Sequence, residues 1–292
     1  MLTSQPEKIA CEKRNLAYAR VCVSIHANYF MTVKIGIIGG SGFYQFLKGK
    51  EVAIKTPYGQ PSDKILISKY SGKEIAFLPR HGKKHQYPPH KINYRANLLA
   101  FKKLGVERVI APCAVGSLKP EIKPGDFLIG DQFIDRTKRR IDTFFDGPQV
   151  AHISMAEPYC PELRKIAIRG CQKLKIPFYK KGRIVVIEGP RFSTKAESEF
   201  YSKIADIINM TQYPEVVLAR ELGMCYLNIS LVTDYDVGLK GRKDIKPVTA
   251  KEVIRIFQKN NEKVKELILE IIKNLPGQRN CKCAAALKEA FV

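Results

Sequence analysis

Two carboxylates, Asp234 and Asp236, directly follow a long apolar run at 224–232. Such a run is typical of a buried strand, so we expect at least one of the two side chains to lie in a cleft. A buried carboxyl group that keeps its proton can act as a general acid. Asp also ends strands simply as a turn former, so these two residues alone leave both interpretations open.

A second polar cluster, Asn209-Met210-Thr211, precedes the same strand. Between them, 214–223 begins with proline and ends with glycine, a pattern that predicts a short helix. Clusters separated by one helix and one strand can lie side by side at one end of a parallel sheet, where open α/β sheets bind their ligands. We therefore expect Thr211 and Asp234 to share a cleft.

Two further segments that follow predicted strands, 39–42 and Arg80-His81, carry groups that could bind an anion. The run 39–42, Gly-Gly-Ser-Gly, can expose backbone N–H groups together with the Ser41 hydroxyl, or it can be a plain turn. Its glycine spacing does not match a dinucleotide-binding motif. Arg80 offers a planar donor fork and His81 a second donor, the alternative being a solvated basic loop. Because both sites follow strands, their combination favours an anion site.

The remaining pattern alternates strands with helices. We expect strands at 33–38, 64–70, 73–78, 107–113, 125–129, 183–187 and 224–232, and helices at 93–104, 161–174, 194–204, 214–223 and 249–274. The alternation indicates one α/β domain. Since Met31 directly precedes the first strand, we expect this domain to cover 31–292, with 1–30 as an extension that is disordered or a mis-assigned start.

Hydrophobicity, net charge and cysteine spacing argue against several other classes of protein. No apolar run is long enough to span a membrane. The net charge of +22 could indicate a basic nucleic-acid-binding protein, but the cationic residues are spread along the chain and the densest short run is 136–140. The eight cysteines lack the spacing of a zinc site, the closest pair being Cys281 and Cys283. We expect no metal, no membrane and no specific nucleic acid as partners.

Taken together, the strand-end motifs resemble the purine nucleoside phosphorylase/methylthioadenosine phosphorylase family. The motifs are those at 37–42, 80–82, 188–193, 209–211 and 233–236, with further matching runs at 131–137 and 155–158. The resemblance covers about 33–274. It implies a single α/β domain with a mixed, barrel-like central β-sheet flanked by helices. It also implies a cytoplasmic homotrimer, or hexamer built from trimers, with active sites near subunit boundaries. Inorganic phosphate would be a co-substrate, and no cofactor is expected.

The resemblance assigns roles residue by residue. The phosphate-binding residues that it implies are Ser41, Arg80, His81, Thr211 and the backbone at Cys113 and Ala114. The substrate-binding residues that it implies are Phe192, Met210, Asp234, Tyr235, Asp236 and His152. Phe192 would stack on the purine, Met210 would lie under the ribose, and His152 would reach the 5′ end of the substrate in a neighbouring subunit. Leu287 would close the methylthio pocket. Ser41 and Cys113 stand where members of the family often have threonine.

The implied reaction is phosphate-dependent cleavage of S-methyl-5′-thioadenosine to adenine and 5-methylthioribose 1-phosphate. Asp234 would give a proton to purine N7, since a protonated carboxyl group donates to N7 and a carboxylate accepts from the adenine amino group. The family's 6-oxopurine members carry Asn at this place, so Asp234 favours 6-aminopurines. The alternatives are a 6-oxopurine or broad-specificity phosphorylase and, from another class, a nucleic-acid-binding protein. The resemblance further implies disulfides, Cys281 with Cys283 or Cys160 with Cys225.

Overall fold

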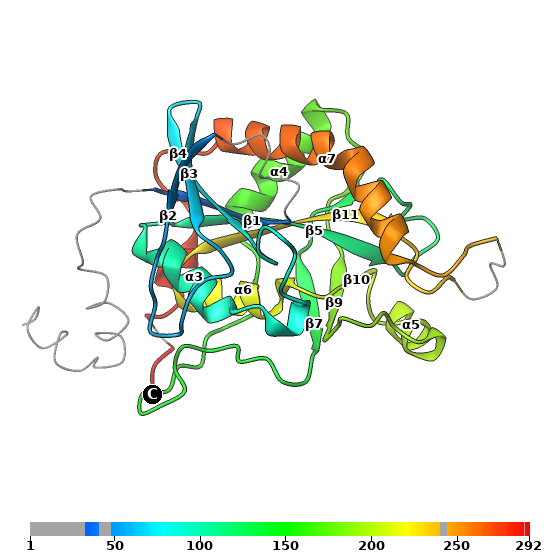
Figure 1. The fold of residues 1–292 in the computed structure, drawn as a ribbon, viewed down its shortest axis with the longest axis horizontal. Helices are drawn as coiled ribbons and strands as arrows, with labels where there is room; N and C mark the ends of the chain where they lie inside the picture. Colours follow the sequence, from blue (N-terminus) through cyan, green and yellow to red (C-terminus); the bar gives the residue numbers. More distant parts are fainter. Residues whose placement is uncertain (1–32, 41–47, 240–243, 289) are drawn as a thin grey trace, which may run out of the picture.

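The fold comes from a computed structural model of the 292-residue chain. The structure describes residues 33–40, 48–239, 244–288 and 290–292 (Figure 1). The predictions for Ser41 and for the extension 1–30 lie outside the described residues.

Two long parallel strands, β5 (Arg108–Ser117) and β11 (Cys225–Asp234), form the centre of the sheet. Both are buried along nearly their whole length, which explains why the sequence 224–232 is largely apolar. The strand β11 pairs along one edge of β5, and two shorter strands pair along the other edge. The first residues of β5 pair in parallel with β1 (Ile35–Gly39), and its last pair antiparallel with β10 (Ile207–Asn209).

The sheet continues outward from these strands. Beyond β1 lie β4 (Lys73–Pro79), β3 (Ile65–Tyr70) and β2 (Gly49–Val52), and beyond β10 lie β9 (Arg183–Ile187) and β7 (Gln132–Arg136). Beyond β11 lie β6 (Phe127–Leu128) and β8 (Phe178–Tyr179). The sheet contains both parallel and antiparallel pairs, so the prediction of a mixed sheet is confirmed.

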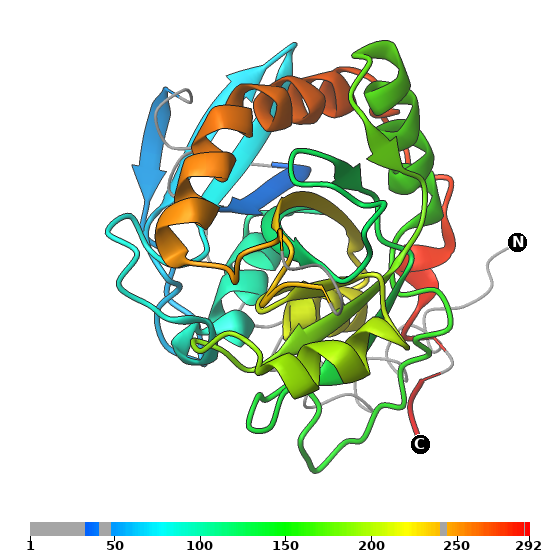
Figure 2. The same ribbon diagram turned by 90° about the vertical axis from the view of Figure 1, so that its right-hand side faces the viewer.

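Helices cover both faces of this sheet (Figure 1). On one face α4 (Pro161–Lys173) packs with α7 (Ala250–Lys273), and on the other α3 (Tyr94–Lys103) packs with α6 (Gln212–Glu221). The helix α5 (Lys195–Ser202) lies across the strands from α7 (Figure 2). Short 3-10 turns occupy Pro89–Lys91 and Lys282–Ala285. Among the described residues, no helix has the length and apolarity needed to cross a membrane.

Local signals placed most elements correctly. The side chain of Asn93 caps α3 and Gly105 follows it with φ +86°, while Ser71 and Gly72, both at positive φ, form the turn of the β3–β4 hairpin. The strand predicted at 125–129 shrinks to the two residues of β6. The prediction that the two polar clusters lie at one end of a parallel sheet is wrong, because β10 runs antiparallel to β5.

The disulfide prediction is also not met. Cys160, Cys225, Cys281 and Cys283 all carry free thiols in this structure.

Candidate active site

The two polar clusters nevertheless meet on β5. The Asn209 amide donates to the carbonyl oxygen of Ala114 (3.3 Å), and its Oδ1 accepts from the backbone N–H groups of Thr211 (2.7 Å) and Gln212 (2.9 Å). One side chain therefore fixes the start of α6 against the centre of β5. This contact places Thr211, which is 6% exposed, next to the backbone at Ala114.

Gly116 on β5 is the point where Asp234, of the cluster 233–236, comes close to β10, which carries the cluster 209–211. It is the register partner of Asp234 on β11, beside an irregularity in the pairing, and of Ile208 on β10. A Cβ atom at Gly116 would lie 2.9 Å from Asp234 Oδ1 and 2.9 Å from Ile208 Cγ2. Only glycine lets both strands approach this point without displacement. The antiparallel β10 thus reaches the same place that a parallel strand was expected to reach.

Asp234 carries an unusual carboxyl group. Burial raises its pKa to about 6, although the Thr233 hydroxyl donates to Oδ2 (2.7 Å) and the Asp236 N–H donates to Oδ1 (2.7 Å), and both contacts oppose the shift. Near neutral pH the group can therefore hold or release a proton, as a general acid requires.

Asp236 presents an open acceptor beside it. The residue is 2% exposed, and its Oδ2 has no hydrogen-bond partner among the described residues. The Ser198 and Ser193 hydroxyls both lie near enough to lower the pKa of Asp236, and the Ser193 hydroxyl, in a residue that is 6% exposed, also has no hydrogen-bond partner among the described residues. Burial is the largest influence and raises that pKa. Because buried polar atoms are normally paired, these two atoms mark a place for the polar edge of a ligand.

Arg80 is held rigidly on the other side of Ala114. It is 2% exposed, forms a two-pronged ion pair with Glu215, and donates to the carbonyl oxygens of Ile38 (2.9 Å) and Pro112 (3.2 Å). Burial lowers the pKa of Arg80, but the Glu215 carboxylate outweighs burial and raises it overall. The hydroxyl of Tyr226 donates to Glu215 Oε2 (2.9 Å). The guanidinium therefore stays charged in a fixed position beside β5.

Sequence reasoning missed Glu215 as part of this arrangement. It follows Pro214 in the first turn of α6, where an acidic residue is ordinary. Only its position among buried apolar neighbours, Val216 and Val217, hinted at a buried charge that needs a partner.

His81 differs from the expected donor. Its Nδ1 lies 2.8 Å from the carbonyl oxygen of Tyr87, which can only accept, so Nδ1 carries the proton. The ring stacks on His85 with centroids 4.3 Å apart. Burial lowers the pKa of His81 to about 4, so the imidazole is neutral at pH 7 and Nε2 is an acceptor.

The other predicted residues are distributed around this centre. Met210 packs against Gly189, where a Cβ atom would lie 2.8 Å from the Met210 sulfur. Phe192 is 37% exposed in the loop before α5. The Cys113 thiol accepts from the Asn228 amide (3.1 Å), which leaves the backbone as the part of this residue suited to phosphate.

Tyr235 and His152 lie outside the centre. The Tyr235 hydroxyl donates to the carbonyl oxygen of Pro120 at 3.4 Å, so it points away from the carboxylate pair. His152 is exposed, and its backbone N–H donates to Ala290 in the C-terminal tail (2.7 Å). Leu287, in the same tail, packs against the core that contains α3 and α6. Within the described parts of the chain, nothing connects His152 to Asp234 directly.

Comparison with known proteins places this arrangement in a family. The model of the phosphorylase superfamily matches residues 34–273. The chain belongs to the phosphorylase superfamily. It is 57% identical over 264 residues to S-methyl-5′-thioadenosine phosphorylase of Thermofilum pendens, an alignment that covers 89% of this chain and 99% of the relative.

Solved structures of superfamily members agree. A methylthioadenosine phosphorylase sourced from an antarctic soil metagenomic library has a TM-score of 0.84 at 42% identity, covering 89% of this chain and 93% of its own. A methylthioadenosine phosphorylase of Schistosoma mansoni in complex with adenine has a TM-score of 0.82 at 37% identity, covering 88% and 96% of the two chains.

Two hollows are found among the described residues of the chain. The larger, about 910 Å³, lies between the ends of β7 and β9 and α5, and includes Glu188, Gly189 and Phe200. The smaller, about 510 Å³, is lined by His152, Tyr213 and Glu221 among others. Neither is lined by Asp234 or Asp236, so these two hollows do not enclose the carboxylate pair.

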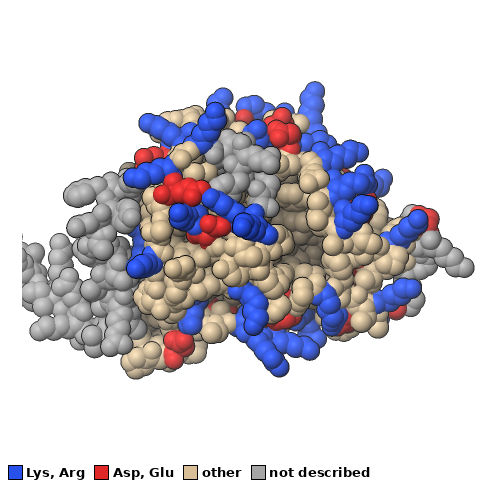
Figure 3. All heavy atoms as spheres, viewed as in Figure 1, with Lys and Arg blue, Asp and Glu red and all other residues tan. Residues whose placement is uncertain are grey.

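The positive charge is spread out on the face of the molecule that Figure 3 shows. On the face shown in Figure 3, Lys and Arg side chains are scattered over several elements, with acidic groups and uncharged surface between them. Arg140, in the densest basic run, has a side chain only 3% exposed and donates to the carbonyl oxygens of Tyr213, Ile187 and Glu188. This arginine supports the loop structurally and does not offer its charge to solvent.

Proposed function

We propose that this chain cleaves S-methyl-5′-thioadenosine with phosphate, releasing adenine and 5-methylthioribose 1-phosphate. The observation that carries the proposal is the buried pair of Asp234, with its pKa raised to about 6, and Asp236, with an open oxygen. Its relatives support the proposal, since the Thermofilum pendens protein is named S-methyl-5′-thioadenosine phosphorylase and the Schistosoma mansoni enzyme was solved in complex with adenine.

The purine edge matches this carboxylate pair in hydrogen-bonding pattern. Adenine offers N7 as an acceptor and its amino group as a donor. Protonated Asp234 donates to N7, while the open oxygen of Asp236 accepts from the amino group and the Ser193 hydroxyl can accept from the amino group or donate to a ring nitrogen. A 6-oxopurine presents acceptors at both positions and would leave a buried carboxylate facing an oxygen, which costs several kcal/mol, about the penalty of an unmet buried hydrogen bond.

Phosphate binds on the opposite side of Ala114. Arg80 supplies a fixed positive charge, Thr211 and backbone N–H groups supply donors, and His81 accepts from the P–OH group. Ser41 adds a hydroxyl in this proposal. A phosphate oxygen attacks C1′ of the ribose, the C1′–N9 bond breaks, and the bonding electrons pass into the purine. Asp234 transfers its proton to N7, and the resulting carboxylate is reprotonated from solvent.

The substrate's 5′ end requires a neighbouring subunit in this proposal. His152 is exposed and remote from Asp234 in its own chain, and Phe200, 50% exposed, lines the larger hollow beside the site. A second subunit that brings its His152 to this hollow would cover Phe200 and Phe192. We therefore propose a cytoplasmic homotrimer or hexamer, which needs no cofactor. Light scattering on a size-exclusion column measures the assembly, and a monomer with full activity would contradict this role of His152.

The decisive experiment measures base release from methylthioadenosine, adenosine and inosine, with and without phosphate. We expect adenine from methylthioadenosine only with phosphate, and poor release from inosine. Asp234→Asn should remove most of the activity, whereas Asp146→Asn, a matched change of a carboxylate whose side chain is 60% exposed, should not. Preference for inosine would overturn the specificity argument, and release without phosphate would overturn the phosphorolytic reaction.

A further inference from the structure

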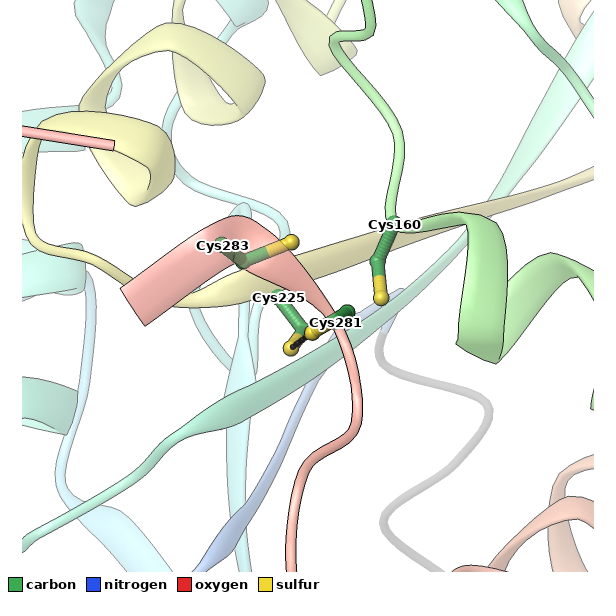
Figure 4. Close-up of side chains that lie close together, drawn as sticks. All are labelled: Cys160, Cys225, Cys281 and Cys283. Carbon is green, nitrogen blue, oxygen red and sulfur yellow. Dashed lines mark hydrogen bonds between the residues drawn. The ribbon is translucent and has the colours of Figure 1, made fainter. Parts of the chain in front are cut away.

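Four cysteines from three distant segments converge at one point. Cys160 is the N-cap of α4, Cys225 begins β11, and Cys281 and Cys283 lie at the 3-10 turn of the C-terminal tail (Figure 4). Their four sulfur atoms all lie within 4.8 Å of one another. Cys160, Cys225 and Cys283 are buried, and Cys281 is half-buried. No catalytic role described above uses them.

The distances suit a single metal ion better than two disulfides. Tetrahedral zinc with Zn–S bonds of about 2.3 Å holds its sulfur atoms about 3.8 Å apart. Here the sulfur atoms of Cys225 and Cys281 lie 3.3 Å apart, and all six separations stay within 4.8 Å. A pair of disulfides would divide the sulfurs into two bonded pairs at about 2 Å, whereas this structure has four free thiols facing one centre.

The sheet beside the cluster carries a buried cation, Arg108. Arg108 is the register partner of Cys225 on β5, so its side chain leaves the same face of the sheet. It is 2% exposed, and its Nε and Nη2 have no partner among the described residues. A zinc ion with four thiolates carries two negative charges, which a buried guanidinium on this face helps to balance.

We propose that Cys160, Cys225, Cys281 and Cys283 bind one Zn²⁺ in a closed tetrathiolate site. Soft thiolates in tetrahedral geometry select zinc among the common divalent ions. Each thiol gives up its proton as the ion binds, and no oxidant or reductant takes part. Sulfur fills all four positions, so the ion has no open position for water or substrate and is structural.

The site fastens the C-terminal tail to the body of the protein. Around it, Arg279 donates to the Gly223 carbonyl oxygen (2.8 Å) and the Asn280 N–H donates to Glu162 (3.3 Å). Further on, Phe291 forms a bridge with Ala151, directly before His152. Zinc would therefore hold in place the segment that packs beside His152.

The test uses the full chain without a histidine tag, purified with a phosphine reductant from zinc-supplemented cells. Elemental analysis should find about one zinc per chain, as one tetrathiolate site requires. Cys281→Ala and Cys283→Ala should lose it. Cys171→Ala, which removes another buried thiol in α4 outside the cluster, should retain it. Cobalt loaded in place of zinc should show the thiolate-to-metal charge-transfer bands and visible bands of a tetrahedral site.

Two results would overturn the proposal. One is no bound zinc after reduction and incubation with Zn²⁺, with all eight cysteines titrating as thiols in denaturant. The other is a protein purified without reductant that holds no metal and has lost four thiols, which would indicate two disulfides. Should the variants fail to fold, the cobalt spectrum of the unaltered protein still decides, since absence of the charge-transfer bands excludes the site. None of these readouts depends on turnover, so they stand apart from the proposed function.

Discussion

The strongest prediction concerns the pH dependence of base release. If Asp234 is the acid that protonates N7, only its protonated form supports catalysis. With its pKa raised to about 6, half of the protein is in that form at pH 6. About one part in a hundred remains protonated at pH 8, two units above the pKa, so kcat/KM for methylthioadenosine should fall about fifty-fold between pH 6 and 8. Activity is therefore lost as pH rises.

The assay needs two precautions. Phosphate itself titrates near pH 7, so the dianion concentration, not the total, is held constant and saturating across the series. His81 does not confuse the profile, because its pKa is lowered to about 4, below the range studied. Adenine release is followed at low nucleoside concentration, where the rate reports the protonation state of the free protein.

Asp234→Asn supplies the comparison. An amide can donate a hydrogen bond to N7 but cannot transfer a proton, so kcat/KM at pH 6 should fall by about 10²–10⁴, the usual contribution of a general acid. Its profile should be flat between pH 6 and 8. In Asp236→Asn the falling limb should move by less than about one pH unit, because burial and not the Asp236 charge is the largest cause of the raised pKa. If kcat/KM of the unaltered protein were constant between pH 6 and 8, as is expected for Asp234→Asn, the role of Asp234 as the acid would be refuted.

Three further predictions follow from buried contacts. Glu215→Ala leaves Arg80 charged and unpaired in the interior, so the free energy of unfolding in urea should fall by about 3–5 kcal/mol, while Asp146→Asn changes it little. Gly116→Ala places a Cβ atom 2.9 Å from Asp234 Oδ1, so unfolding should become easier by about 1–3 kcal/mol and adenine release should slow; normal kinetics would show that the strands can separate here. Burial raises the pKa of Glu221 to about 7, so the folded protein holds this proton more tightly than the unfolded chain. The free energy of unfolding should therefore decrease by about 3 kcal/mol as pH rises from 4.5 to above 7. Glu221→Gln should remove this part of the dependence and leave the part that comes from Asp234, whose pKa is also raised, and thermal melts of both proteins across that range measure the difference.

Elements marked by local chemistry could be predicted from the sequence. The α3 helix has its cap at Asn93 and its stop at Gly105, and the β3–β4 turn has Ser71 and Gly72 at positive φ. Each of these signals depends on residues only a few positions apart. The position of the polar residues that end β11 could also be predicted, because a long apolar run indicates a buried strand whichever strands lie beside it.

Features that depend on distant partners could not be predicted. The three residues of β10 are too short to show a period, and their antiparallel pairing with β5 is decided by the whole sheet. The Glu215 that pairs with Arg80 lies 135 residues away. Zinc-site spacing rules likewise consider ligands close in sequence, whereas Cys225 and Cys281 are 56 residues apart and meet only in the folded chain.

One strand, β5, anchors both parts of the proposed site. Arg80 donates to the carbonyl oxygen of Pro112 on β5, and Asp234 lies beside Gly116, where β10 pairs with β5. Four residues of one strand separate these points, about 13 Å at the usual rise per residue. In the proposed function Arg80 belongs to the phosphate site and Asp234 to the purine site, so a single covalent segment of β5 sets the spacing of the two backbone points that anchor them. Adding or removing one residue within 112–116 would turn Asp234's partner position to the opposite face, so this interval of β5 should tolerate changes of side chain far better than changes of length.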